Sequence, residues 1–419
     1  MPTAPFFYLI VEDNKTATLA STPRWGRALT GVPAAGEFQM TSWQQLPHVL
    51  IFRLAQHAER TLDARSATCC VVASPAGSNE ECGQLRKDSD VADRIVQLGQ
   101  RTCPGRPIVV VDGPDADGTK DAVCHQLWSA RSCARGGDDP LVRLTGNAPG
   151  IQSEVRTRLN RGSCRRLEPT PYLSHARSPL AAAQVAPGRR RLRIAYAAAS
   201  WGHIDAEAHG FVAWRKALRN ACKTAARADA ARCNWVWISM SGQGAEQAVR
   251  QYAQADFCLQ PPGDTLPRPG MIDSLSVGCV PVLFHPAQAT LWPLHWPNAN
   301  RSSLLFDWTS GAPRPKTRAH AAYAERAKAV VDALLRVPDA ELRALRKGVA
   351  EAATTMLYAA KPTAATGRSD AIDLIVRQMR PLRLLPDAAE RSRYAQQLAA
   401  RTGLLEAQRV YERGRQGRP

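Results

Sequence analysis

Residues 255–286 read ADFCLQPPGDTLPRPGMIDSLSVGCVPVLFHP, and this stretch decides the fold. Asp256–Gln260 (DFCLQ) is a short strand pattern that ends in a Pro-Pro-Gly-Asp loop. A helix is expected from about Gly270 to Val277, and Val280–Phe284 is a second short apolar run. A strand, a loop, a helix and a further strand in this order predict a βαβ unit with parallel strands.

The sequence before this stretch extends the same alternation. Arg191–Ala197 (RLRIAYA) and Trp235–Ser239 (WVWIS) are typical of strands, and Gly210–Arg227 between them is expected to be a long helix. Another helix, Gly244–Ala255, leads into the quoted stretch. Strands of this kind, separated by helices, indicate a parallel sheet covered on both faces.

The first half of the chain shows a similar pattern. Phe6–Val11, Cys69–Ala73 and Pro107–Val111 are short apolar runs that predict strands. The segment Trp43–Thr61 is expected to be helical beyond Pro47. These runs predict a second parallel sheet near the N-terminus.

A linker and a helical C-terminus complete the predicted organisation. The Pro- and Arg-containing segment Arg177–Arg191 separates the two α/β parts, and the chain from Thr317 onward is expected to be nearly all helix. We therefore predict an α/β protein with a Rossmann-like domain over 1–185 and a second over 190–355. C-terminal helices and a basic tail are expected over 356–419.

The composition narrows the classes of partner. Lys+Arg of 55 against Asp+Glu of 37 gives a net charge of +18, which favours nucleotide phosphates, acidic glycans, anionic membrane surfaces or nucleic acid. The arginines are scattered, and no zinc-finger, RRM or helix-turn-helix pattern supports nucleic acid. The 11 cysteines include no CxxC pair, so we expect no metal site. No window reaches the roughly 18 continuous apolar residues of a membrane span.

The loop in the quoted stretch is the first candidate site. It follows the carboxyl end of a predicted strand and opens a helix, and such positions bind phosphates through free backbone N–H groups. We expect the Gly263-Asp264-Thr265 loop and Arg268 to hold a diphosphate. Asp273 would accept hydrogen bonds from ribose or sugar hydroxyls. The same spacing also fits an ordinary βαβ turn with a solvated arginine and aspartate.

The quoted stretch resembles the signature of the exostosin-like glycosyltransferases, most of all their xyloglucan galactosyltransferase-like branch in plants and algae. That branch carries FCLQPPGDS-type residues, an arginine-containing turn, a DS or DA pair, and a GCIPV strand followed by FHP. Their counterparts here, without a gap, are Phe257–Thr265, Arg268, Asp273-Ser274, Gly278–Val282 and Phe284–Pro286.

Weaker similarity extends over much of the remaining chain. Pro169–Tyr172 followed by His175 is similar to the family segment before the second domain, and Asp370–Asp373 is similar to a C-terminal DAFD element. His175 is therefore one candidate general base, and Asp112, at the end of a predicted strand, is the other. A turn or capping role fits each of them as well. The sequence departs from the family at Ala198, Trp201, Pro269 and Gly270.

The resemblance implies a GT-B-like architecture, with two Rossmann-like domains facing across a cleft. It implies an inverting transfer of a hexose or uronic acid, galactose-type favoured, from a UDP-sugar to a cell-wall or extracellular polysaccharide. The nucleotide sugar would bind the C-terminal domain and the acceptor glycan the N-terminal one, with no bound metal and no nucleic acid. A catalytically inactive glycan- or nucleotide-sugar-binding relative is the alternative, because of the departures at Ala198 and Trp201.

Further implications concern location and individual residues. The resemblance implies the Golgi lumen, type II membrane association through an anchor not visible in this chain, and oligomers with related transferases.

The family has cysteines near Cys222 and Cys233, which implies a disulfide there, with buried thiols as the alternative. The Asp115–Asp117 segment matches the DxD metal motif of the other glycosyltransferase architecture and equally fits an acidic turn. Sugar stacking or core packing is expected of Trp292, Trp296 and Trp308.

Overall fold

The computed structural model describes residues 6–11, 50–51, 53–73, 91–106, 108–112, 141–145, 166–169, 171, 174–175, 190–198, 211–238, 242–263, 268–292, 295–307, 319–358 and 370–379. The described residues up to 172, together with those after 357, form one compact unit, and those from 173 to 357 form a second. The domain limits 1–185, 190–355 and 356–419 stay predictions, because residues 176–189 and 380–419 lie outside the described residues.

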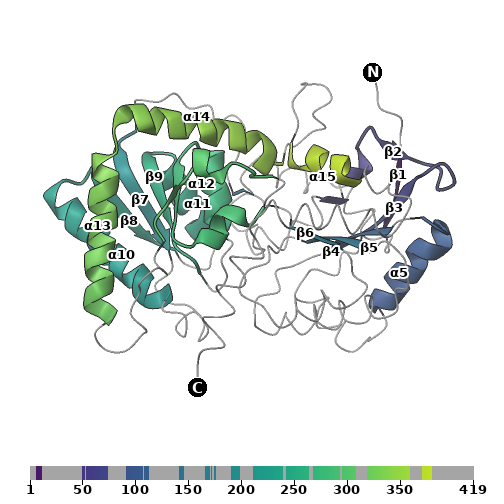
Figure 1. Cartoon of the computed structure of the whole chain (residues 1–419), viewed down its shortest axis with the longest axis horizontal. Coiled ribbons are helices and arrows are strands. Elements are labelled where there is room, and N and C mark those ends of the chain that lie inside the picture. Colours follow the sequence, from purple (N-terminus) through teal and green to yellow (C-terminus); the bar gives the residue numbers. More distant parts are fainter. Residues whose placement is uncertain are drawn as a thin grey trace. The chain divides into compact units, whose positions relative to one another are not determined.

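Unit 1 contains a parallel sheet in the order β2-β1-β3-β4-β5-β6 (Figure 1). The strands are β1 Phe7–Val11, β2 Arg60–Thr61, β3 Cys69–Ala73, β4 Ile108–Asp112, β5 Leu141–Thr145 and β6 Arg166–Pro169. Its helices include α5 Val91–Thr102 and α15 Ala371–Met379. The three strands predicted here, β1, β3 and β4, are confirmed, whereas β5 and β6 were not predicted.

The helix predicted over Trp43–Thr61 is wrong at its C-terminal end. Arg60 and Thr61 form β2, which pairs with Phe7 and Tyr8 of β1. The backbone N–H of Phe6 also donates to the Glu59 carbonyl at 2.8 Å. In a longer helix, the backbone N–H and C=O groups of residues 59–61 would bond within the helix. Here they bond to the edge of the sheet instead, so the helix ends earlier.

The Asp370–Asp373 element caps helix α15. The Asp373 N–H donates to Asp370 Oδ1 at 3.1 Å, and the Asp370 N–H donates to Asp373 Oδ2 at 3.0 Å, which is a reciprocal capping box. The buried Arg53 guanidinium pairs with Asp370 at 2.8 Å, and His57 lies 3.2 Å from Asp373. The element therefore begins α15 and anchors it to a segment more than 300 residues earlier.

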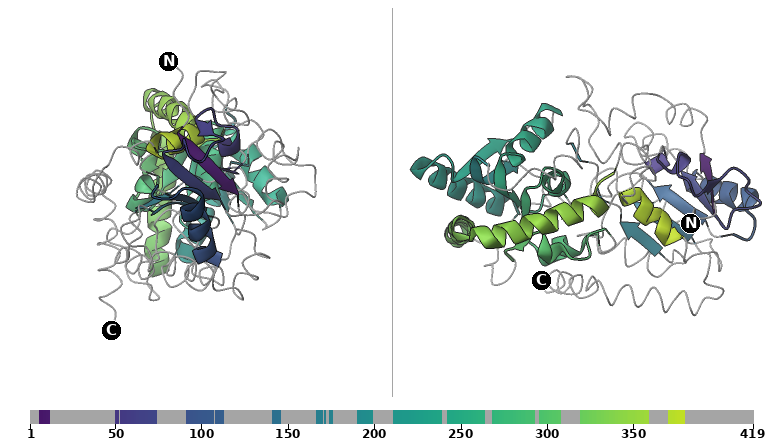
Figure 2. Two further views of the ribbon diagram at one scale, coloured as in Figure 1. Left: turned by 90° about the vertical axis from the view of Figure 1, so that its right-hand side faces the viewer. Right: turned by 90° about the horizontal axis from the view of Figure 1, so that it is seen from above.

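Unit 2 contains a second parallel sheet, in the order β11-β10-β9-β7-β8. Its strands are β7 Leu192–Ala198, β8 Cys233–Trp237, β9 Ala255–Gln260, β10 Val280–Leu283 and β11 Leu304–Leu305. Helices α10 Phe211–Ala228 and α13 Ala319–Arg336 cover one face, and α11 Gly242–Tyr252 and α12 Pro269–Ser276 cover the other (Figure 2). Helix α14, Asp339–Met356, packs against α12.

The predicted α/β class with two Rossmann-like parts is confirmed at the level of the two units, each of which contains a parallel sheet. The GT-B-like arrangement stays a prediction. In unit 2 every predicted strand and helix is present within a few residues of its expected ends. The described elements that were not predicted are the short strand β11 and two short 3-10 helices, Pro286–Thr290 and Ala299–Arg301. Trp292 and Trp296 are buried in the core, so the core-packing alternative holds for both. Trp308 lies outside the described residues.

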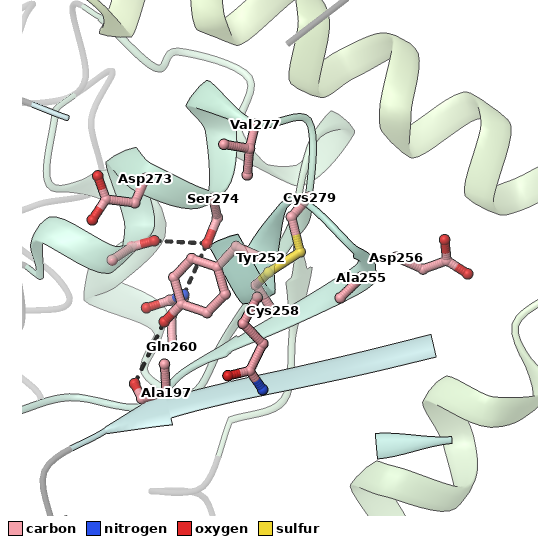
Figure 3. Close-up of a disulfide and its surroundings, with 12 residues drawn as sticks. Ala197, Tyr252, Ala255, Asp256, Cys258, Gln260, Asp273, Ser274, Val277 and Cys279 are labelled. Carbon is pink, nitrogen blue, oxygen red and sulfur yellow. Dashed lines mark hydrogen bonds between the residues drawn. A yellow bond between two sulfur atoms is a disulfide. The ribbon is translucent and has the colours of Figure 1, made fainter. Parts of the chain in front are cut away.

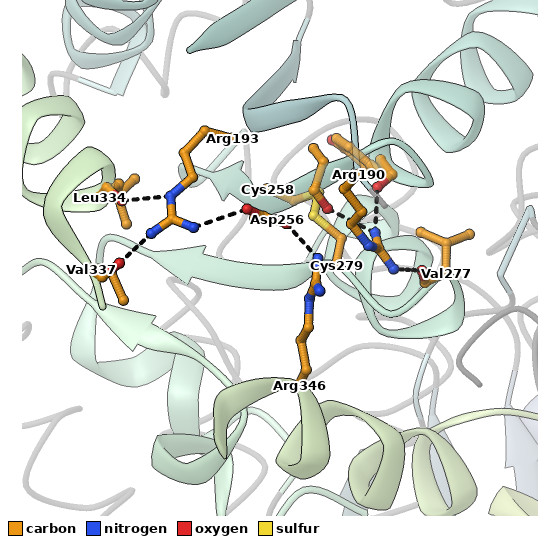
Figure 4. Close-up of polar contacts among 11 residues, drawn as sticks. Arg190, Arg193, Asp256, Cys258, Val277, Cys279, Leu334, Val337 and Arg346 are labelled. Atoms are coloured by element: carbon orange, nitrogen blue, oxygen red, sulfur yellow. Dashed lines mark hydrogen bonds and ion pairs between the residues drawn. A yellow bond between two sulfur atoms is a disulfide. The ribbon is translucent and has the colours of Figure 1, made fainter. Parts of the chain in front are cut away.

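Arginines bind backbone carbonyls at the amino-terminal end of the unit 2 sheet (Figure 4). Arg190 donates to the carbonyls of Tyr252, Ala255 and Val277 at 3.1, 2.7 and 2.7 Å. Burial and the nearby charge of Arg346 lower the pKa of Arg190 to about 10. This arginine, which lies in the predicted linker, fastens the start of unit 2 to three of its own elements.

A partly buried acidic residue joins two further arginines at this end of the sheet. Asp256 pairs with Arg193 at 3.0 Å and with Arg346 of α14 (Figure 4). Arg193 also donates to the carbonyls of Leu334, at 3.2 Å, and Val337, at the C-terminal end of α13. Cations at a helix C-terminus are favoured by the helix dipole. Arg190, Arg193 and Arg346 thus bind groups of the protein itself, so these three positive charges are not available to a partner molecule.

Candidate functional site

The candidate site lies where the strand order of unit 2 reverses direction. The chain passes from β7 to β8 on one side and then returns to β9 on the other side of β7. In open parallel sheets, ligands bind at the carboxyl ends of the two strands at such a switch point. Here those ends are Ala198 and Gln260, and Gln260 continues into the buried residues Pro261, Pro262 and Gly263. Gly263, the first residue of the loop predicted from sequence, therefore lies at the position that this topology favours for a ligand.

Gln260 fixes the end of β9 against α12 (Figure 3). Its side-chain amide donates to Ser274 Oγ at 2.8 Å, and Ser274 Oγ in turn donates to the Gly270 carbonyl at 2.6 Å. A Cβ atom added at Gly270 would lie 2.6 Å from Gln260 Oε1 and 3.3 Å from the Tyr252 hydroxyl. The departure from the family at Gly270 thus leaves room for this buried amide.

Glycine is also required where α12 ends. Gly278 has φ of +70°, its N–H donates to the Leu275 carbonyl at 3.2 Å, and the Cys279 N–H donates to the Ser274 carbonyl at 2.9 Å. This is a Schellman arrangement, in which a left-handed glycine satisfies the last carbonyls of a helix. The Gly-Cys pair of the signature therefore ends α12 and directs the chain into β10.

A disulfide between Cys258 and Cys279 fastens the same region (Figure 3). It joins the middle of β9 to the residue that precedes β10, and both cysteines are fully buried. Two other disulfides are described: Cys222–Cys233 joins α10 to β8, and Cys70–Cys103 joins β3 to the residue after α5. The Cys222–Cys233 bond implied by the resemblance is confirmed, and the other two were not predicted.

Arg268 is positioned at the start of α12, directly after the loop. Its guanidinium donates to the Pro261 carbonyl at 3.0 Å, and the side chain is half-buried. Among the described residues it has no carboxylate partner. Within the described part of the chain, the Arg268 charge is thus not paired with a carboxylate, which suits an arginine that binds a diphosphate.

Asp273 and His175 lie together in unit 2. The carboxylate of Asp273 accepts a hydrogen bond from the His175 backbone N–H at 2.7 Å, and its Oδ2 lies 2.9 Å from His175 Nδ1. Ser174 Oγ lies 3.0 Å from Asp273 Oδ1 and 2.8 Å from Ser276 Oγ. Asp273 is buried, with 3% of its surface exposed, so these contacts occupy most of its accepting capacity.

The His175–Asp273 pair has a defined electrostatic preference. Burial alone lowers the pKa of His175, but the negative charge of Asp273 and the hydrogen bond to it outweigh burial, so the pKa is raised above its usual value. By contrast, burial lowers the pKa of His285, in the FHP segment, to about 4. His175 is thus the more basic of these two histidines, and a carboxylate orients its ring.

The other predicted site residues are described in part or not at all. Asp112 is the last residue of β4, paired in register with Thr145, and its side chain is outside the description. Asp264, Thr265 and the Asp115–Asp117 segment lie outside the described residues. Within the described part of the chain, no group of three or more His, Cys, Asp or Glu side chains is arranged to hold a metal ion.

Two residues at the site had no predicted role. Ser174 and Gln260 both occur within segments that carry the resemblance, yet local spacing gave no reason to single them out. Both residues contact side chains of α12: Gln260 contacts Ser274, and Ser174 contacts Ser276. Their roles are therefore visible only in the folded structure.

Comparison with protein families identifies this part of the molecule. Residues 146–310 match the model of the exostosin GT47 domain. The matched range includes β7 to β11, the switch-point loop, Arg268 and the His175–Asp273 pair.

Sequence relatives of the chain are found among plant transferases of Arabidopsis thaliana. The chain is 29% identical over 134 residues to xyloglucan galactosyltransferase MUR3, covering 32% of this chain and 20% of that protein. It is 37% identical over 62 residues to xyloglucan-specific galacturonosyltransferase 1, covering 15% of this chain and 9% of that protein. The chain thus spans a fifth or less of the length of these two relatives.

Solved structures include distant matches. The pneumococcal O-GlcNAc transferase GtfA, in complex with UDP and GlcNAc, matches with a TM-score of 0.35 and 10% identity, covering 75% of this chain and 56% of that one. A GtfA/B complex matches with a TM-score of 0.37 and 12% identity, covering 81% of this chain and 60% of that chain. In the described part of the chain, no helix is both long and apolar enough to span a membrane.

Proposed function

We propose that the chain is an inverting glycosyltransferase that moves a hexose or uronic acid, galactose-type favoured, from a UDP-sugar to a cell-wall or extracellular polysaccharide. The observation that carries this proposal is the signature loop of an exostosin domain at the switch point of a parallel sheet, with Arg268 beside it. The plant relatives named for xyloglucan galactosyl and galacturonosyl transfer support the choice of donor and acceptor class.

In this mechanism the loop and Arg268 stabilise the leaving diphosphate. The loop residues Gly263, Asp264 and Thr265 bring backbone N–H groups to the phosphates, and the planar guanidinium of Arg268 donates to two phosphate oxygens. Charge that develops on the UDP leaving group is met by groups already in place, which is the main source of catalysis in such transfers. We propose no metal in this role.

His175 is the general base that the described geometry supports. With Nδ1 directed to Asp273, Nε2 is the ring nitrogen that takes the proton from the acceptor hydroxyl. Asp273 then acts as the orienting carboxylate, and its raising of the His175 pKa strengthens the base. Asp112 stays the alternative base, on the other unit. The acceptor glycan is proposed to bind mainly on unit 1.

A catalytically inactive relative that binds nucleotide sugar or glycan is the second candidate. It is favoured by Ala198, which stands at the switch point where the family carries glycine, and which is buried there. The active transferase and the inactive relative would both bind UDP at the same site, but only the transferase would transfer the sugar.

The proposed compartment is the Golgi lumen, reached with a membrane anchor that is not among the described residues. Three disulfides in the described residues support an oxidising compartment, because such bonds are rare in the cytosol. We propose a nucleotide sugar and a glycan as the partners, together with related transferases, and no nucleic acid.

The test is release of UDP from a panel of UDP-sugars in the presence of polysaccharide acceptors. Arg268→Ala should reduce the rate by at least about 100-fold. The rate of Arg268→Lys should lie between those of the unmodified chain and Arg268→Ala, because lysine keeps the charge but lacks the planar guanidinium. Arg250→Ala is the matched control, since Arg250 is exposed on α11 and pairs only with Glu246 among the described residues. Saturable UDP binding without turnover would favour the inactive relative, and absence of both would reject the proposal. Rates unchanged by EDTA are expected.

A further inference from the structure

Helix α10 carries a row of cations along one face. Lys216, Arg219, Lys223 and Arg227 recur every three or four residues, which places them on one side of a helix. Lys216, Lys223 and Arg227 are exposed and Arg219 is half-buried. The helix contains no Asp or Glu. From Lys216 to Arg227 the helix rises 11 steps, or about 17 Å at 1.5 Å per residue, which is enough for several sugar rings of an extended chain.

Tryptophans of the adjacent edge strand lie beside this row. Strand β8 is the last strand of the unit 2 sheet, and Trp235 and Trp237 share one face of it because their positions differ by two. Lys223 Nζ lies 4.6 Å and Arg219 Cζ 5.6 Å from the centre of the Trp235 ring. Trp237 is 44% exposed, which is unusual for so large an apolar side chain.

The surface is rigid. The Cys222–Cys233 disulfide joins α10 to the first residue of β8, so the cations and the tryptophans keep a fixed spacing. The apolar side of α10, including Val212, Trp214 and Leu218, is buried in the unit. The helix therefore has no apolar face left to enter a lipid surface, which argues against membrane binding.

Trp237 ends β8 at the same edge of the sheet as the switch-point loop. All strands of this sheet are parallel, so the carboxyl ends of β7, β8 and β9 lie along one edge. A polymer seated on α10 and β8 would thus run along the unit toward the edge where the candidate site lies.

We propose that Lys216, Arg219, Lys223, Arg227 and Trp237 form a binding surface for a linear acidic polysaccharide. The cations attract its carboxylates, and the exposed indole of Trp237 stacks on the apolar face of a sugar ring. This surface is separate from the loop that binds the nucleotide sugar. The inference rests on the proposed function only in taking a polysaccharide, instead of another polyanion, as the partner.

The experiment is binding of polygalacturonate to the disulfide-bonded chain, without any UDP-sugar, by biolayer interferometry. The double variant K216E/K223E should weaken binding by at least about tenfold, and Trp237→Ala by at least about fivefold, since an exposed indole that stacks on a ligand contributes strongly. The affinity of the unmodified chain should fall with added salt. Because no turnover is measured, this result is independent of whether the chain transfers sugar.

Matched controls lie elsewhere in unit 2. R343E/K347E makes the same change in net charge on exposed positions of α14, and Leu305→Ala removes an exposed apolar side chain at the opposite edge of the sheet. Both should leave binding within about twofold, as surface changes outside an interface do. Equal weakening by R343E/K347E would show nonspecific charge attraction and overturn the proposal. Duplex DNA bound more tightly than polygalacturonate, or unchanged binding in Trp237→Ala, would also overturn it.

Discussion

Replacing Asp273 by Asn tests the buried pair at the centre of the site. The change keeps the size of the side chain and removes its charge. Three hydrogen bonds are affected, to the His175 backbone N–H at 2.7 Å, to His175 Nδ1 at 2.9 Å and to Ser174 Oγ at 3.0 Å. Each loses about 1 kcal/mol when its acceptor becomes neutral, so the free energy of unfolding should fall by about 3 kcal/mol near pH 6.

The size of this loss should depend on pH. The folded state raises the pKa of His175, so the stabilisation from the charged histidine is fully present below its unfolded pKa and disappears as pH rises through the folded value. At pH 9 the neutral ring still donates its Nδ1–H to Asp273, but the attraction between opposite charges across this contact is lost. The loss caused by Asp273→Asn should then shrink to about 2 kcal/mol.

Denaturant unfolding at pH 6 and pH 9, followed by tryptophan fluorescence, measures both values. Histidine-labelled NMR titration of the folded protein should show that the His175 pKa falls in the variant, because burial then acts without a compensating charge. The control is Asp332→Asn, which removes an exposed pair with Lys328 on α13 and should cost less than about 1 kcal/mol at either pH. A loss by Asp273→Asn that is the same at pH 6 and pH 9 would refute the reasoning.

Three further predictions concern the frame of unit 2. The double variant C258S/C279S, which opens a link across 21 residues, should lose about 3 kcal/mol of unfolding free energy in denaturant titrations without reductant. Gly348→Ala should lose about 1–3 kcal/mol, because its Cβ would overlap the backbone carbonyl oxygen of Arg301; an unchanged unfolding midpoint would contradict this packing. Gly278→Ala should lose about 1–2 kcal/mol, measured in the same way, since φ of +70° is strained for alanine.

Local patterns were enough to predict most elements of unit 2. Asp256–Gln260, the helix after Arg268 and Val280–Phe284 are each defined by residues within a few positions of one another, and the structure contains them. The edge strand β2 was missed because it is only two residues long and exists through pairing with β1. Pairing of distant backbone segments leaves no periodic signal in the sequence.

The sequence singled out Arg268, Asp273 and His175 one by one, but not the pairing of the last two. The position of Arg268 followed from the signature, whereas the bond between Asp273 and His175 joins residues 98 positions apart, which no local spacing reveals. The disulfides show the same limit. With 11 cysteines in the chain, many pairings are compatible with the sequence, and Cys70–Cys103 and Cys258–Cys279 are selected by the proximity of folded elements.

Mass spectrometry of an acceptor oligosaccharide after incubation with single UDP-sugars tests the central claim most directly. The account predicts a gain of one hexose or one uronic acid residue, and loss of this gain in Arg268→Ala but not in Arg250→Ala. An acceptor whose mass never changes with any UDP-sugar, while UDP still binds saturably, would contradict the claim that this chain is a transferase.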